Sequence, residues 1–404
     1  MSERAEVSGS FPGRLALQQR VLPTYRLPFF EALAASCQGG LTVFAGQPAA
    51  GESITSLDPL SGAHPAPNLS LNFTANRHWR TPSSLFYLCW QARLLKWLTQ
   101  EEPNALIVEA NPRIRSTPAA IRWMKARQRP VLGWGLGAPA PHGPLAGLRG
   151  RGWPRFLRQF DALIAYSPLG AEQYRLQGFP AERIFVAPNA VTPRPSAPPP
   201  PRPVQEGSAG SGSEAWFLRS PAPTPALTTP TVLFVGRLQA RKRIEDLLRA
   251  TAALPAAIQP RLQVVGDGPA RSALQALAQE VYPSAEFPGE RTGPDLEPYF
   301  AAADLFVLPG TGGLAVQQAM AHGLPVIAAQ GDGTLDALIR PANGWRVPPS
   351  DLPALSAALH TALTDIPRLR RMGAESYRIV AEEVNLEIMV DTFIDALTKL
   401  PQIG

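Results

Sequence analysis

One segment in the second half of the chain, residues 304–329, constrains the fold more than any other. An apolar stretch at 304–308 predicts a strand, a Pro-Gly-Thr-Gly-Gly turn follows it, a helix is expected over about 313–322, and a second buried strand over 325–329. Bare glycine N–H groups at the start of a helix stabilise an anion or a polarised oxygen. In open α/β sheets, ligands bind at the carboxyl ends of the strands. We therefore expect an anionic or sugar-like ligand at this turn.

Strand and helix patterns alternate through the whole chain. In the first half, strands are expected at 15–22, 41–45, 105–109, 130–134, 162–166 and 183–187, and helices at 28–36, 84–98, 118–127 and 169–177. In the second half, strands are expected at 232–235, 262–265, 304–308 and 325–328, and helices at 244–253, 270–280, 294–302, 313–322 and 351–363. Such alternation is typical of parallel sheets covered on both faces. We expect an α/β protein with two Rossmann-like, doubly wound parallel-sheet domains that face each other across a cleft.

A change in composition divides these two domains. Residues 192–230 hold eleven of the 45 prolines, together with a Gly/Ser-rich run, so this stretch cannot bury enough apolar surface to offset its ordering entropy. We expect an N-terminal domain over 1–191, a linker over 192–230 and a second domain over 231–366. The remaining residues, 367–404, show helical periodicity and are expected to cross back to the first domain.

The charge of the chain is uneven. Residues 1–191 hold 20 Lys and Arg against 11 Asp and Glu, whereas residues 192–404 hold 18 against 21. Most of the cations are Arg, which can follow from genome composition alone. The other interpretation is that the first half meets an anionic acceptor or a membrane surface. We do not expect a nucleic acid partner, because the basic residues are spread out and no recognition module accompanies them.

Several absences in the sequence point to the cytoplasm. There is no apolar run of about 18 residues, no secretory leader pattern, and only two cysteines. We expect a cytoplasmic protein, with peripheral attachment to the inner face of the cell membrane as an alternative. Residues 84–98 and 145–158 mix aromatic and basic side chains, which suits either a membrane-interfacial surface or a solvated face over core aromatics.

Two further motifs lie in the second half. A predicted strand ends at Gly236-Arg237, and Lys242 follows five residues later in a loop that also contains two more arginines. Guanidinium and ammonium groups bind phosphate oxygens well, whereas cations at a helix N-terminus oppose the helix dipole. This loop therefore favours a diphosphate site over a solvated helix start. The second motif, Gly266-Asp-Gly268-Pro269, is by itself only a tight turn.

Taken together, these motifs resemble the family-4 retaining glycosyltransferases, which have the GT-B fold and use nucleotide-sugar donors. The matching stretches are Gly-Arg-Leu with Lys242, Val-Gly-Asp-Gly-Pro, Phe-Pro-Gly-Glu-Arg, Ala-Asp-Leu-Phe-Val-Leu-Pro, Gln-Ala-Met-Ala-His-Gly-Leu-Pro-Val-Ile-Ala and Asn-Gly-Trp-Arg-Val. In the first half, Phe-Asp-Ala-Leu-Ile-Ala-Tyr-Ser and Ile-Phe-Val-Ala-Pro-Asn-Ala-Val match the end of that family's acceptor domain. The resemblance covers most of the chain outside the linker.

The resemblance implies a role for individual residues. Arg237 and Lys242 would hold the donor diphosphate and stabilise the leaving group, in place of a metal ion. Donor-binding positions would be Gly236, Gly266, Gly289, Glu290, Arg291, Gly312, Gly313, Leu314 and Gln318. The acceptor side would include Tyr25, Arg26, Trp134 and Asn189. No cofactor or metal is expected; the nucleotide-diphosphate sugar is a co-substrate, and the acceptor would be a glycan or a lipid-linked molecule.

The chain departs from the family pattern at three places. Where the family has two glutamates separated by seven residues, this chain has Gly310 and Gln318. An amide at Gln318 can still bind a ribose diol, but Gly310 offers no side chain to a sugar. A histidine that often follows the fourth strand of the first domain is also missing. The nearest histidine is His142, in a Pro/Gly-rich loop.

Glu109 is a candidate for a catalytic or acceptor-binding role. It ends a predicted buried strand, where an unpaired carboxylate would be unfavourable. A purely structural ion pair with Arg113 or Arg115 is an equal alternative. The main expectation is a glycosyltransferase that acts with retention in glycan, glycolipid or cell-surface polysaccharide synthesis. Two rivals are a catalytically inert GT-B protein that binds a nucleotide sugar or a partner, and an epimerase or hydrolase that uses Glu109, Glu290 and His142.

Overall fold

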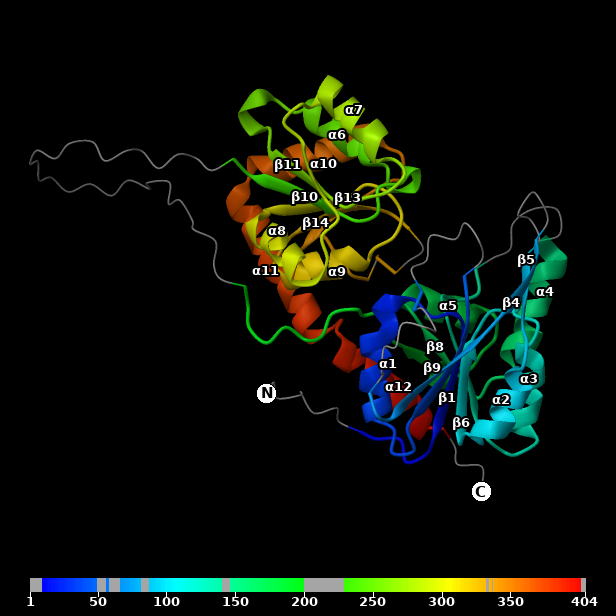
Figure 1. The fold of residues 1–404 in the computed structure, drawn as a ribbon. Helices are drawn as coiled ribbons and strands as arrows, with labels where there is room; N and C mark the ends of the chain where they lie inside the picture. The colour runs from blue at the N-terminus through cyan, green and yellow to red at the C-terminus, as the bar shows by residue number, and fades with distance from the viewer. Residues whose placement is uncertain are drawn as a thin grey trace, which may run out of the picture. The chain divides into compact units, whose positions relative to one another are not determined.

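The computed structural model of the protein describes residues 9–48, 56–57, 66–80, 87–139, 146–199, 229–331, 334–335 and 337–400 (Figure 1). The chain divides into two compact units. The first comprises Met1–Arg194, Asp332–Ala337 and Glu382–Gly404, and the second comprises Pro195–Gly331 and Leu338–Ala381. Most of the expected linker and His142 lie outside the described residues.

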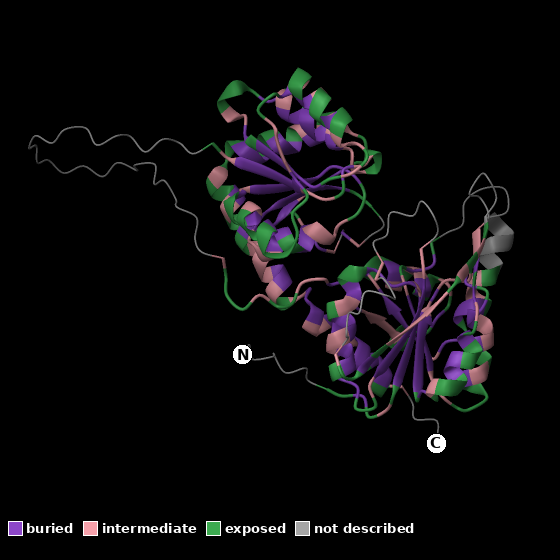
Figure 2. Cartoon of the chain, viewed as in Figure 1, coloured by how far each residue is buried: buried purple, intermediate pink, exposed green. Residues whose placement is uncertain are grey.

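The first unit is built on a seven-stranded parallel sheet with the strand order β3-β2-β1-β6-β7-β8-β9. Its strands are β1 (Leu15–Val21), β2 (Leu41–Gly46), β3 (Leu69–Thr74), β6 (Ala105–Glu109), β7 (Val131–Gly135), β8 (Ala162–Ala165) and β9 (Ile184–Val186). Strands β1, β2, β6, β7 and β8 are almost wholly buried, as expected for a sheet covered on both faces (Figure 2). The sequence prediction of a parallel α/β domain is therefore confirmed.

Helices cover both faces of this sheet. They are α1 (Leu27–Ala35), α2 (Leu94–Glu101), α3 (Thr117–Lys125), α4 (Ala146–Leu157), α5 (Pro168–Leu176) and α12 (Leu386–Thr398). Residues of α2, α3, α4 and α5 share one apolar core with the sheet, while α12 packs on α1. In α4, Phe156 and Leu157 are buried in that core and Trp153 packs against it. The aromatic residues described within 145–158 are therefore core residues, which favours the core interpretation of that segment.

The helix expected at 84–98 is partly wrong. Tyr87–Gln91 form a strand, β5, which pairs in antiparallel fashion with β4 (Asn76–Arg80). Helix α2 begins only at Leu94, directly after Arg93, which adopts a left-handed conformation with φ of 64°. Apolar residues predominate on both sides of Arg93, and no glycine or proline separates the strand from the helix. The change from a period of two to a period of 3.6 is therefore hidden in the sequence.

The second unit has a six-stranded parallel sheet with the order β12-β11-β10-β13-β14-β15. Its strands are β10 (Thr231–Val235), β11 (Arg261–Val265), β12 (Glu286–Gly289), β13 (Leu305–Leu308), β14 (Val326–Ala329) and β15 (Gly344–Val347). Its helices are α6 (Ile244–Ala252), α7 (Arg271–Val281), α8 (Glu297–Ala302), α9 (Leu314–Ala321), α10 (Leu352–Thr364) and α11 (Ile366–Glu382). The four expected strands are present, and β12 and β15 are short edge strands that the sequence prediction missed.

The C-terminal helices are divided between the two units. Helix α11 belongs to the second unit, whereas α12 belongs to the first. Helix α12 begins at Leu386, after Asn385, whose side chain accepts a hydrogen bond from the N–H of Ile388 at 2.9 Å and so caps the helix. Phe393 of α12 packs against Phe29 of α1, with ring centroids 4.9 Å apart. Of the helices expected within residues 367–404, α11 thus lies in the second unit up to residue 381 and α12 lies in the first unit.

No helix among the described residues has both the length and the apolar character needed to span a bilayer.

Candidate functional site

The loops that follow three neighbouring strands converge in the second unit. Strand β10 lies between β11 and β13, so the chain leaves β10 in one direction to reach β11 and later returns on the other side as β13. Ligands bind at such a switch point, outside the carboxyl ends of the strands. The loops that lie there are 236–243 after β10, 266–270 after β11 and 309–313 after β13.

Two of these loops touch through glycine backbone. A Cβ on Gly266, which has φ of +144°, would lie 2.0 Å from the carbonyl oxygen of Gly236. A Cβ on Gly268, with φ of +153°, would lie 2.3 Å from the carbonyl oxygen of Leu238. The N–H of Leu238 also donates to the carbonyl of Asp267 at 2.8 Å. The Gly-Asp-Gly motif therefore needs glycine to support the Arg237 loop, whether or not it also contacts a ligand.

Lys242 lies against the glycine-rich turn after β13. Its Nζ would be only 2.5 Å from a Cβ on Gly312, so the ammonium group occupies the space that a side chain would fill. The two loops are joined by a backbone hydrogen bond from the N–H of Thr311 to the carbonyl of Arg241, at 3.0 Å. Nη1 of Arg241 lies 3.4 Å from Oγ1 of Thr311. Two cationic side chains therefore flank the turn that precedes helix α9.

Gly310 has a structural reason to be glycine. A Cβ at this position would lie 2.2 Å from the carbonyl oxygen of Arg241 and 2.5 Å from the carbonyl carbon of Lys242. These are backbone atoms, which cannot rotate out of the way. The two loops are in backbone contact at Gly310, and a side chain at this position does not fit without a shift of the turn.

The surroundings of Lys242 disfavour its charged form. Burial, and then repulsion from Arg241, lower its pKa to about 8. Lys242 and Arg241 are neighbouring cations that repel each other, and a diphosphate bound beside them would offset this repulsion. An ammonium with a lowered pKa gains its proton again when an anion binds beside it.

This lowered pKa gives a testable pH dependence. The ammonium of Lys242 is present below its pKa of about 8 and is lost above it, so binding of a nucleoside diphosphate should weaken as the pH rises above 8, by about tenfold per pH unit. Lys242→Arg keeps its charge throughout this range, so its dissociation constant should stay level. Calorimetric titration from about pH 7 to about pH 10 measures both profiles. A level profile in the unaltered protein would show that Lys242 does not contact the diphosphate.

The remaining predicted donor residues lie on the same edge of the second sheet. Arg237, Glu290, Arg291 and Gln318 are exposed, Gly313 and Leu314 are partly buried, and Gly289 is buried. The carbonyl of Gly289 accepts the N–H of Gly266 at 2.9 Å, which ties the loop after β12 to the loop after β11. Gly313 precedes helix α9, and Leu314 is its first residue. Gln318 lies one turn into that helix.

A second cluster of predicted residues forms in the first unit, around Arg26. Arg26 is buried and lies in the 3₁₀ turn Thr24–Arg26 after β1. The centre of its guanidinium is 4.4 Å from the ring centroid of Trp134 and 5.4 Å from that of Tyr166. Its Nη2 donates to the hydroxyl of Tyr166 at 2.9 Å, and Tyr25 beside it is 37% exposed. The carboxyl ends of β1, β7 and β8 thus meet in one aromatic and cationic cluster.

Glu109 joins this cluster from the end of β6. Its Oε1 accepts the backbone N–H of Arg20 at 2.5 Å, and its own N–H donates to Oε1 of Gln18 at 3.2 Å. Burial raises the pKa of the carboxyl group, while the hydrogen bond from Arg20 and the charges of Arg20 and Arg26 oppose that rise. The charges that lower the pKa of Glu109 are those of Arg20 and Arg26, and not those of Arg113 or Arg115, which the structural alternative had named.

Three side chains were not assigned roles from the sequence. Tyr166 holds Arg26, Arg241 flanks the turn after β13, and Thr311 joins the loops that follow β10 and β13. Tyr166 directly follows β8, and this position at the carboxyl end of a strand could have marked it as a candidate site residue. The other predicted acceptor residue, Asn189, lies after β9, where the neighbouring Ala190 N–H contacts Sδ of Met389 in α12 at 3.4 Å.

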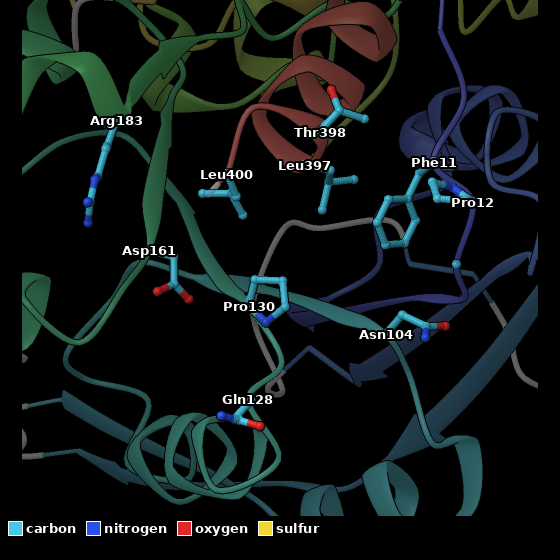
Figure 3. Close-up of a pocket in the computed structure, with 11 residues that line it drawn as sticks. Phe11, Pro12, Asn104, Gln128, Pro130, Asp161, Arg183, Leu397, Thr398 and Leu400 are labelled. Carbon is cyan, nitrogen blue, oxygen red and sulfur yellow. The ribbon is translucent and has the colours of Figure 1, made fainter. Parts of the chain in front are cut away.

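The first unit also contains a cavity of about 720 Å³ at the opposite, amino-terminal edge of its sheet (Figure 3). Phe11, Asn104, Pro130 and Asp161 line it from the segments that precede the strands, and Leu397 lines it from α12. The carboxylate of Asp161 already has partners, because it pairs with Lys125 and accepts a hydrogen bond from the N–H of Val131 at 2.7 Å. None of the predicted site residues lines this cavity.

Comparison with known structures identifies the class of fold. HepE of Anabaena, solved in complex with UDP, superposes on 96% of this chain and 100% of its own length, with a TM-score of 0.67 and 16% sequence identity. Together with the two parallel sheets, this likeness shows that the chain has the GT-B fold of glycosyltransferases.

Sequence comparison points in the same direction for the second unit. Residues 229–365 match the family model described as glycosyl transferases group 1. Over 186 residues the chain is 34% identical to a GDP-mannose-dependent monoacylated alpha-(1-6)-phosphatidylinositol monomannoside mannosyltransferase of Corynebacterium glutamicum, covering 43% of this chain and 49% of that protein. Over 155 residues it is 39% identical to a GDP-mannose-dependent alpha-mannosyltransferase of Mycolicibacterium smegmatis, covering 37% and 38%. The chain therefore matches half or less of the length of these relatives.

Proposed function

We propose that this protein is a glycosyltransferase that moves a sugar from a nucleotide-diphosphate sugar to an acceptor hydroxyl, with retention of configuration. The observation that carries the proposal is the position of Lys242 against the turn at Gly312, at the switch point of the second sheet. The match of residues 229–365 to a glycosyltransferase family model supports it. Synthesis of a glycan, a glycolipid or a cell-surface polysaccharide is the expected setting.

In this mechanism the second unit binds the donor and stabilises the leaving group. Lys242 and Arg237 neutralise the negative charge that develops on the diphosphate as the bond between its oxygen and the anomeric carbon of the sugar breaks. A metal ion has this role in other transferases. The amides of Gly313 and Leu314, at the start of α9, face the same charge. Transfer to the same face of the sugar from which the diphosphate leaves would retain the configuration.

The first unit would bind the acceptor. Tyr25 is partly exposed beside Arg26 and offers a hydroxyl and a ring face, which suit a sugar. Glu109, held by Arg20, is the carboxylate that could accept a proton from the acceptor hydroxyl. Its raised pKa makes it a stronger base than an ordinary glutamate.

Donor consumption tests the proposal. The protein is incubated with GDP- and UDP-sugars, with and without candidate acceptors, and the products are separated by chromatography. A transferase releases the nucleoside diphosphate and forms a new glycoside. Tight binding without turnover would favour the inert GT-B protein, since Gly310 and Gln318 replace two glutamates. A new nucleotide-sugar isomer would favour the epimerase.

Glu109→Gln separates the catalytic role from the structural one. Glutamine keeps the shape and can still accept the N–H of Arg20, but it cannot take a proton. We expect donor affinity to be unchanged and the transfer rate to fall about 100-fold. Steady-state kinetics with a fixed acceptor measure the rate, and calorimetry measures donor affinity.

The stability of the same variant gives the control. A carboxyl group whose pKa is raised in the fold destabilises the folded state when ionised, and this effect disappears as the pH falls through its pKa. Glu109→Gln should therefore be at least as stable as the unaltered protein at neutral pH, and should lose the gain on acidification. Lower stability with normal transfer would instead show a purely structural group.

A further inference from the structure

One face of the β4–β5 hairpin is aromatic and open to solvent. In the antiparallel register Arg77 lies opposite Trp90, and Trp79 lies opposite Leu88. Paired residues share a face, and residues two apart along a strand share it as well. All four side chains therefore project from the same side of the hairpin. On that side Trp79 is 51% exposed and Trp90 is 41% exposed.

The opposite face of the hairpin fixes this orientation. Nδ2 of Asn76 donates to the carbonyls of Arg20 at 2.7 Å and Gln47 at 2.9 Å. Nε2 of Gln91 donates to the carbonyl of Gln19 at 2.9 Å, and Cys89 is fully buried. A shift of one residue would exchange the two faces and break these bonds. The tryptophans are thus held outward by polar contacts at the base of the hairpin.

The charged residues described as exposed on this face and at the beginning of α2 are all basic. Arg77 is exposed, as are Arg93, Leu95 and Lys96 at the beginning of α2, directly after the hairpin. The sequence from residue 59 to residue 100 contains four Lys and Arg residues but no Asp or Glu. We call Arg77, Trp79, Trp90, Arg93, Leu95 and Lys96 the hairpin surface. By contrast, the exposed leucines of α5 stand beside a charge-balanced pair, Glu172 and Arg175.

We propose that the hairpin surface docks on an anionic lipid bilayer. Tryptophan rings partition into the interface between head groups and acyl chains, and each nearby Lys or Arg gains attraction to a negatively charged leaflet. A basic protein partner would be repelled by this surface, because its charged members, Arg77, Arg93 and Lys96, are all basic. An exposed aromatic and basic surface of this kind suits a lipid surface that carries anionic head groups.

Docking here would bring lipid close to the candidate acceptor site. The carbonyl of Arg20 accepts from Asn76 at the base of the hairpin, and the N–H of Arg20 donates to Glu109. The hairpin and the carboxylate are therefore joined through one residue of the first unit. This step rests on the proposed function: if the protein is a glycosyltransferase, the acceptor it takes is lipid-linked and reaches Glu109 from the membrane side.

The docking test uses vesicles and no donor. The full chain is sedimented with vesicles of phosphatidylcholine alone and of phosphatidylcholine mixed with phosphatidylglycerol. We expect at least tenfold tighter binding to the mixed vesicles, with binding that weakens as salt rises. The double variant Trp79→Ser, Trp90→Ser should lower the affinity about tenfold or more. Arg77→Gln and Lys96→Gln should each lower it about fivefold for mixed vesicles only.

Matched controls separate docking from folding and from catalysis. Leu169→Ser and Leu176→Ser, on α5, remove leucines that are 47% and 69% exposed, and vesicle binding should not change. If the tryptophan variant fails to fold, as judged by circular dichroism, the two charge variants decide the outcome. The proposal is overturned if the unaltered protein does not bind mixed vesicles, or if the α5 variants weaken binding as much as the hairpin variants. Absence of sugar transfer would disprove the proposed function and leave the vesicle result intact.

Discussion

Lys242→Ala should lower kcat/KM for sugar transfer by about 100-fold or more. The ammonium group lies against the turn at Gly312, where the charge of the departing diphosphate would develop, and removing one such electrostatic group typically lowers the rate by about 10²–10³. A hydrogen bond to a charged group contributes about 1.5–3 kcal/mol, so the affinity for the free nucleoside diphosphate should fall about 10–100-fold. Steady-state kinetics and calorimetric titration measure the two effects.

The control for this change is Lys399→Ala. Lys399 is an exposed lysine that pairs with Asp395 at 2.6 Å in the first unit, so its loss removes the same charge without touching the donor loops. Donor affinity and rate should stay as they are. If Lys242→Ala behaves like Lys399→Ala, the diphosphate does not bind at the turn after β13, and the donor site must be placed elsewhere.

Gly310→Ala should destabilise the second unit by about 3 kcal/mol and abolish tight donor binding. The added methyl group would lie 2.2 Å from the carbonyl oxygen of Arg241. Overpacking against atoms that cannot rotate away carries a penalty of about 1–3 kcal/mol, occasionally more. The loop would have to shift, and with it the ammonium of Lys242. Denaturant unfolding, followed by fluorescence, measures the change in free energy.

Gly331→Ala is the matched glycine variant. Among the described residues other than its chain neighbours, no heavy atom lies within 4 Å of a Cβ placed on Gly331. The stability of Gly331→Ala should therefore stay within about 0.5 kcal/mol of that of the unaltered protein. If Gly310→Ala instead had the stability and the donor affinity of the unaltered protein, the turn at Gly310 would be free to move. In that case the absence of a glutamate at this position would have no packing explanation.

The general fold could be predicted from the sequence because parallel strands leave a clear pattern. Strands such as β8 and β13 are buried runs of apolar residues, and the helices between strands repeat with a period of 3.6. The hairpin at 76–91 could not be found in the same way. Its outward face is aromatic instead of polar, so the alternation that normally identifies an antiparallel strand is missing.

The position of the proposed donor loops was the easiest part of the candidate site to predict. Glycines and cations follow directly after predicted strands, so their position at one edge of the sheet follows from the order of elements. The contacts between loops could not be read in this way. Gly310 lies against the backbone of Arg241, and Glu109 accepts a hydrogen bond from the N–H of Arg20 and does not pair with Arg113. Both contacts join segments that are far apart in the sequence, so they depend on the tertiary structure.

The position of α12 has a consequence for how the protein is made. In chain order, the second unit is inserted into the first, because the strands of the first unit come at the beginning and its last helix comes near residue 398. During synthesis, Phe29 and Trp134 emerge early, but Phe393, which covers them, emerges last. The second unit, built from one nearly continuous stretch, is therefore synthesised in full before the first unit receives its closing helix.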